Sequence, residues 1–120
     1  MKTHRDLKVW SDSIKFVTKL YEITNDYPKN ELYGITSQIR RAAISIPSNI
    51  AEGAARNSKK EFNNFLSIAL GSASELETQL IISKNLNYLK KEIAESLIIE
   101  LNSIQKMIHG LMKSLKSSDN

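Results

Sequence analysis

The sequence predicts an all-α protein: an antiparallel up-down-up-down four-helix bundle with a proline-kinked second helix. Apolar residues recur every three or four positions over four long stretches, short polar segments separate these stretches, and no segment alternates apolar and polar residues as a strand would. The helices are expected at about 7–27, 35–56, 59–85 and 90–116, within one domain spanning residues 1–120.

The first helix is expected to begin after Asp6, an acceptable N-cap. It should end before Pro28, because the proline ring disfavours helical geometry at the preceding Tyr27. Charged residues fall mostly on one side of this helix. The other side carries the apolar face, which is expected to consist of Trp10, Ile14, Val17, Tyr21 and Thr24, widened by Phe16 and Leu20.

The second helix contains Pro47 in the middle of its pattern. Proline removes the hydrogen bond to the carbonyl of Ala43 and crowds that group, so we expect a kink at this point. The apolar spacing stays in phase across Pro47, which favours one kinked helix. The alternative is two short helices broken at Ser45-Ile46-Pro47.

The third helix begins with a capping box, in which the Ser58 hydroxyl can accept from the Glu61 amide. Its centre, residues 69–74, is unusually small, and Gly71 lowers helix propensity by about 1 kcal/mol relative to alanine. We therefore expect another backbone to approach this centre closely. The fourth helix carries a heptad-like apolar seam, which comprises Leu97, Leu101, Ile104, Ile108, Leu111 and Leu115.

The composition excludes several classes of protein. The sequence contains no cysteine, which rules out a disulfide framework, a thiolate zinc site and a cysteine nucleophile. No apolar run approaches the roughly 20 residues of a membrane span, and the N-terminus lacks the apolar core of a signal peptide. We therefore expect a cytoplasmic protein without a membrane partner.

The net charge of +4 is unevenly distributed. Residues 1–60 contain 11 Lys and Arg against 6 Asp and Glu, whereas residues 61–120 contain 6 against 7. A basic half is compatible with RNA or DNA as a partner, although many basic proteins bind neither.

The second helix has three faces on a helical wheel: an apolar core face, a polar stripe, and a flank of mostly small or apolar residues. A monomeric bundle buries only one apolar face, so the flank predicts an oligomer interface. The alternative is a core face wide enough to include Ile44 and Ala51. The predicted interface residues are Arg40, Ile44, Pro47, Ala51 and Ala55.

Two basic groups are candidates for binding nucleic acid. Arg40 and Arg41 are suited to phosphate contacts, because a guanidinium binds phosphate oxygens in pairs and stays charged. Arg56, Lys59 and Lys60 lie near the start of the third helix, where exposed amides also favour anions. The alternative is that Arg41 and Arg56 pair with Glu52 or with a neighbouring subunit and that the lysines are simply solvated.

The sequence does not favour an enzyme. A di-metal bundle needs a Glu-x-x-His motif from each of two helices, and neither His4 nor His109 has a glutamate three positions earlier. No P-loop, G-x-S-x-G or H-E-x-x-H motif is present. We therefore expect no catalytic residue, no metal and no cofactor.

Several segments of the chain form a recognisable pattern. They are D-L-K-V-W at 6–10, Y-E-I-T at 21–24, Y-P at 27–28, Y-G-I-T-S-Q-I-R-R-A-A-I-S-I-P-S-N-I-A-E-G at 33–53, E-F-N-N-F-L at 61–66 and G-S-A-S-E-L-E at 71–77. These segments resemble a known family, the four-helix-bundle proteins encoded in intervening sequences of bacterial 23S rRNA genes.

This resemblance implies a left-handed antiparallel bundle that assembles into a ring-shaped homopentamer. The family is similar to the accessory variability proteins of diversity-generating retroelements, which bind nucleic acid and a reverse transcriptase through basic surfaces. Two hypotheses follow: a non-enzymatic oligomeric bundle that binds RNA or DNA electrostatically, and a protein-interaction scaffold whose central motif serves self-assembly only. A reverse transcriptase is an expected partner if the protein is a retroelement accessory.

Overall fold

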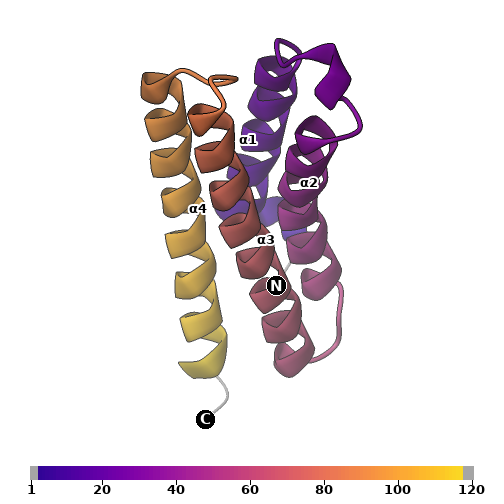
Figure 1. The fold of residues 1–120 in the computed structure, drawn as a ribbon. Coiled ribbons are helices and arrows are strands. Elements are labelled where there is room, and N and C mark those ends of the chain that lie inside the picture. Colours follow the sequence, from indigo (N-terminus) through magenta and orange to yellow (C-terminus); the bar gives the residue numbers. More distant parts are fainter. Residues whose placement is uncertain (1–2, 118–120) are drawn as a thin grey trace.

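The computed structural model describes residues 3–117 and contains four long helices and two short 3-10 turns (Figure 1). No strand occurs within these residues. The all-α, four-helix prediction is therefore confirmed. The elements in order are η1 (His4–Asp6), α1 (Lys8–Thr24), η2 (Lys29–Glu31), α2 (Ile35–Ala54), α3 (Lys59–Asn85) and α4 (Lys91–Ser117).

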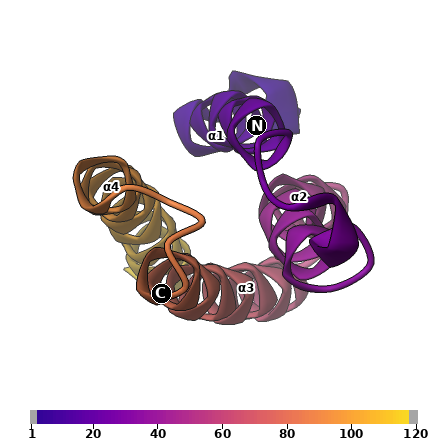
Figure 2. The same ribbon diagram turned by 45° about the horizontal axis from the view of Figure 1, so that its top comes forward.

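The helices surround a common core in chain order, with consecutive helices running in opposite directions (Figures 1 and 2). The α1–α2 and α3–α4 connectors lie at one end of the bundle, and the α2–α3 connector lies at the other. The most extensive contact joins α2 and α3, and the least extensive contact between neighbours joins α4 to α1. An ion pair between exposed Lys19 and Glu100 bridges this α1–α4 seam.

The ends of α1 differ from the prediction. The N-cap residue is Leu7, which has no side-chain cap, so the assignment of Asp6 as the cap was wrong. The helix ends at Thr24, three residues before the expected end. After Thr24 the chain forms tight turns, in which the amide of Asp26 donates a hydrogen bond to the carbonyl of Ile23 and the amide of Tyr27 donates one to the carbonyl of Thr24. These turns place Pro28 outside the helix, where its missing amide donor matters least.

The second helix is continuous through Pro47, so the alternative of two short helices is wrong. A kink at Pro47 stays a prediction. The helix ends at Ala54, two residues earlier than expected, with Ala55 as its C-cap. The third helix has its predicted bounds, and the Glu61 amide donates to the Ser58 hydroxyl at 3.1 Å, which confirms this half of the capping box.

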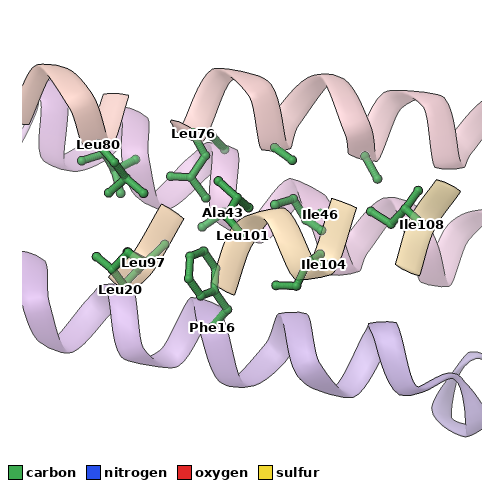
Figure 3. Close-up of a cluster of buried hydrophobic side chains, with 14 of the residues drawn as sticks. Phe16, Leu20, Ala43, Ile46, Leu76, Leu80, Leu97, Leu101, Ile104 and Ile108 are labelled. Atoms are coloured by element: carbon green, nitrogen blue, oxygen red, sulfur yellow. The ribbon is translucent and has the colours of Figure 1, made fainter. Parts of the chain in front are cut away.

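The core lies between all four helices (Figure 3). Small residues are buried on both helices of the most extensive contact, Ala42 and Ala43 on α2 and Ala69 and Ala73 on α3. Most of the predicted α4 seam is buried, while Leu111 and Leu115 pack at its edge. The largest fully buried side chains include Phe16, Leu20, Ile39, Ile46, Ile50, Leu66, Leu76, Leu80, Leu97, Leu101 and Ile108.

Two glycines have opposite surroundings. A methyl group at Gly53 would lie 2.8 Å from Cβ of Phe65 and 2.9 Å from Cδ1 of Phe62, so α3 approaches the backbone here too closely for a side chain. At Gly71 a methyl group would meet nothing within 4 Å. The expected close backbone neighbour of Gly71 is therefore not supplied by the described part of this chain.

The buried face of α1 also differs from the prediction. It consists of Val9, Ser13, Phe16, Leu20 and Thr24, so Phe16, Leu20 and Thr24 of the predicted face are buried as expected, whereas Val9 and Ser13 were not predicted. The remaining members, Trp10, Ile14, Val17 and Tyr21, lie to one side and stay partly exposed or exposed. The apolar surface of α1 is thus wider than one core seam, and its outer part remains available.

Candidate assembly groove and basic surfaces

Arg40 is held entirely by the end of α1. Its Nε donates to Thr24 Oγ1 at 3.0 Å, and its Nη2 donates to the Tyr21 carbonyl at 3.3 Å and to Asn25 Oδ1 at 3.1 Å. The guanidinium also lies over the Tyr21 ring, 4.5 Å from its centroid. A cation that satisfies carbonyls at a helix C-terminus is favourable there. Arg40 therefore fastens α1 to α2.

An apolar groove runs between α1 and α2, with a volume of about 300 Å³. Ile14 and Ile44 form its exposed walls, with 39% and 42% of their surface accessible. His4 packs edge-on against Trp10 at one end, with ring centroids 4.9 Å apart. We name this surface the α1–α2 groove, and its lining residues are His4, Trp10, Ile14, Val17, Ile44, Pro47, Ser48 and Ala51.

The α1–α2 groove contains three of the five residues predicted for the oligomer interface: Ile44, Pro47 and Ala51. Arg40 and Ala55 do not line it, since Arg40 binds the end of α1 and Ala55 follows the last turn of α2. The α1 side of the groove was missed because its residues were assigned to the core. The available signal was the width of the apolar face of the first helix, which exceeds what one core seam needs.

The predicted phosphate contacts lie in separate places. Arg41 is exposed near the middle of α2 and faces α3 across a polar groove. Arg56 lies beyond the end of α2, whose 13 residues after Arg41 span about 20 Å at 1.5 Å per helical residue. It forms an ion pair with Glu52 at 3.2 Å and lies 4.9 Å from the Phe65 ring centroid. The two arginine positions therefore do not form one continuous surface.

Lys59 and Lys60 lie at the α2–α3 end of the bundle, where the C-terminal part of α4 adds a further cation. Together with Asn63, Leu115 and Lys116 they line a groove of about 370 Å³. Lys116 was not among the predicted contacts, because sequence spacing does not reveal that the end of α4 meets the start of α3. We refer to Arg56, Lys59, Lys60 and Lys116 as the basic end.

Neither a metal site nor a membrane span is found in the described part of the chain. Among residues 3–117, no three or more His, Cys, Asp or Glu side chains come close enough to hold a metal ion. None of the helices in this range has the length and apolar composition needed to cross a bilayer.

Comparison with known proteins supports the resemblance seen in the sequence. A crystal structure of a protein of unknown function from the S23 ribosomal protein family of Bacteroides thetaiotaomicron superposes with a TM-score of 0.78 at 28% sequence identity, covering 88% of this chain and 98% of that one. No curated protein matches the chain. Residues 5–110 match the family model described as 23S rRNA-intervening sequence protein. The chain therefore belongs to the family of 23S rRNA-intervening sequence proteins.

Proposed function

We propose that this protein is a non-enzymatic helical bundle that assembles with copies of itself through the α1–α2 groove. The observation that carries the proposal is the groove itself, in which two exposed isoleucines flank partly buried Trp10 and Val17, while Pro47, predicted at the interface, is itself buried. Removing apolar surface from water contributes about 25 cal/mol per Å², so covering the groove favours association. The family resemblance favours a ring of five copies.

A closed ring needs a heterologous contact, in which the groove of one copy meets a different surface of the next. The test is particle mass, measured by light scattering coupled to size-exclusion chromatography. Ile44→Asp places a charge in the groove and should give particles smaller than the wild type. Ile99→Asp is the matched control, because Ile99 is 69% exposed on α4 and does not line the groove.

Both variants should retain the wild-type helical circular dichroism spectrum, since neither isoleucine is in the buried core. A wild-type mass for Ile44→Asp would show that the groove is not the contact between copies. Dissociation of Ile99→Asp alone would place that contact on α4 instead.

A second function, electrostatic binding of RNA or DNA, is supported by the basic end. Three lysines from two helices gather there beside the first turn of α3, where exposed amides add positive potential. Arg40 contributes less to this proposal than its sequence position suggests, because its guanidinium is already occupied by α1. Replacing Arg40 would therefore test the fold more than it tests nucleic-acid binding.

The binding test is fluorescence anisotropy with a labelled single-stranded RNA over a range of KCl concentrations. Lys60→Gln/Lys116→Gln should weaken binding and reduce the salt slope by about 0.7 for each phosphate that is no longer neutralised. Lys90→Gln/Lys106→Gln removes the same charge from exposed positions away from the basic end and should have a smaller effect. Equal reductions in both variants would show that only net charge matters, and absence of binding in the wild type would refute the proposal.

A further inference from the structure

The outward surface of α3 is almost free of charge over most of the length of the helix. Between residues 64 and 85, all of which the structure describes, Glu75 is the one charged residue at an exposed position. The exposed residues lie within an arc of about 140° on a helical wheel, with Glu75 towards one edge. We name this surface the α3 face and define it by Ser67, Ile68, Gly71, Ser74, Thr78 and Ile81.

The α3 face has large apolar side chains near its ends and small residues between them. Ile68 and Ile81 are 50% and 38% exposed, although isoleucine side chains gain from burial. Midway between them, a methyl group at Gly71 would meet nothing within 4 Å in its own chain. The backbone of α3 is therefore open at this point to a surface that another molecule supplies.

The remaining exposed apolar residues of the described chain do not form a comparable helix face. Ile93 and Ile99 on α4 point about 120° apart, and Ile99 lies one turn from exposed Glu95. Leu32 and Leu86 belong to the connectors at one end of the bundle (Figure 1). Outside the α1–α2 groove, the α3 face is thus the helix surface that has most to gain from being covered.

The α3 face and the α1–α2 groove match in length and in charge. The groove extends from Trp10 to Val17 along α1, which is about two helical turns or 10 Å. Ser67 and Ser74 are separated by the same distance along α3. The described residues that line the groove include no Asp, Glu, Lys or Arg, so neither surface has to desolvate a charge at its centre.

We propose that the α3 face of one copy occupies the α1–α2 groove of the next copy. This inference rests on the self-assembly proposed above and names its second surface. A chain cannot fill its own groove in this way, because α1 and α3 lie diagonally across the core (Figure 2). The two surfaces differ, so the contact repeats head to tail and closes into a ring where the rotation between copies allows.

Particle mass in variants of the α3 face provides the first test. Ile68→Asp and Ser74→Arg each place a charge on the face, and each should lower the mass towards the 13.6 kDa of a single chain. Both residues are exposed and lie outside the core, so the variants should keep the wild-type helical circular dichroism spectrum. Ile99→Asp is the matched control on α4 and should keep the wild-type mass.

Mixing variants tests whether the two surfaces meet each other. Ile44→Asp keeps an intact α3 face, and Ile68→Asp keeps an intact groove. An equimolar mixture should therefore form pairs of twice the single-chain mass as concentration rises, and nothing larger, because each pair then has no second intact groove and face. A mixture of Ile68→Asp with Ser74→Arg should remain as single chains, because neither variant has an intact α3 face.

The outcomes separate this inference from the assembly proposal. If Ile44→Asp dissociates while Ile68→Asp and Ser74→Arg keep the wild-type mass, assembly through the groove stands and the α3 face is not its partner. If Ile44→Asp and Ile68→Asp do not pair when mixed, the inference is overturned as well. If Ile44→Asp keeps the wild-type mass, the assembly proposal fails and the inference fails with it.

Discussion

Replacing Thr36 by valine should stabilise the bundle, although the residue lies in the interior. Its side chain is 2% exposed, and its hydroxyl oxygen has no hydrogen-bond partner among the described residues. A buried hydroxyl without a partner costs about 1–3 kcal/mol, and valine replaces it with a methyl group of similar size. Because threonine and valine have similar helix propensities, we expect Thr36→Val to raise the free energy of unfolding by about 1 kcal/mol.

Thr24 provides a matched control for the same chemical change. It is 3% exposed, but its hydroxyl donates to the Leu20 carbonyl at 2.7 Å and accepts from Arg40 Nε at 3.0 Å. Thr24→Val removes both bonds and leaves the charged Arg40 donor with fewer acceptors, so it should lower the free energy of unfolding by about 2 kcal/mol. The two identical substitutions should thus differ by about 3 kcal/mol, with opposite signs.

Urea denaturation followed by circular dichroism at a fixed protein concentration measures both changes. A fixed concentration is needed because association would add to the apparent stability. If Thr36→Val destabilises the protein as much as Thr24→Val, the Thr36 hydroxyl has a partner, such as a buried water, and the reasoning is refuted.

Three further predictions concern glycine packing, a buried phenol and the Arg40 contacts. Gly53→Ala should lower the free energy of unfolding, measured in urea, by about 1 kcal/mol, because overpacking against α3 outweighs the gain in helix propensity. Gly71→Ala should raise it by about 1 kcal/mol, because the added methyl group meets no neighbour, and equal effects of the two substitutions would contradict the close approach at Gly53. Burial raises the pKa of Tyr27 above its ordinary value of 10.0, and the nearby Ser83 side chain offsets part of this increase. The two hydroxyl groups do not meet the geometric criteria for a hydrogen bond, so burial is the dominant cause. The neutral phenol therefore contributes its full stabilisation below pH 10, and this contribution disappears as the pH rises through the folded-state pKa. For the wild type the urea midpoint should fall above pH 10, and Tyr27→Phe should make this fall shallower. If the variant and the wild type have the same pH profile, ionisation of Tyr27 does not cause the fall. Arg40→Met should lower the free energy of unfolding by about 2 kcal/mol, because the hydrogen bonds of Arg40 to α1 are removed. Arg41→Met should change the free energy of unfolding by no more than about 0.5 kcal/mol, and similar decreases for both variants in urea denaturation would refute the distinction between these neighbours.

The helices could be predicted from the sequence because their signals are local. The apolar seam of the fourth helix, the Ser58 cap and Pro28 each act within a few residues of where they stand in the chain. The ends of α1 and α2 were less accurate, because turns after the last helical residue depend on local geometry as well as on residue type.

The surfaces were harder to predict because they depend on which helices become neighbours. Arg40 and Arg41 are identical in type and adjacent in sequence, yet one step along a helix turns a side chain by about 100°. That rotation directs Arg40 to the end of α1 and Arg41 to α3. The sequence identified Ile44, Pro47 and Ala51 as a second apolar flank, but only the packing of α1 beside them shows that this flank is one wall of a groove.

The uneven strength of the helix contacts has a consequence for how the bundle opens. The α2–α3 pair has the most extensive contact of the bundle and buries alanines from both helices, whereas α1 and α4 have a smaller contact that is bridged by a solvent-exposed ion pair. Such exposed pairs contribute at most about 1 kcal/mol. Local opening should therefore begin at the α1–α4 seam, and backbone amides of α2 and α3 should be the last to exchange with deuterium.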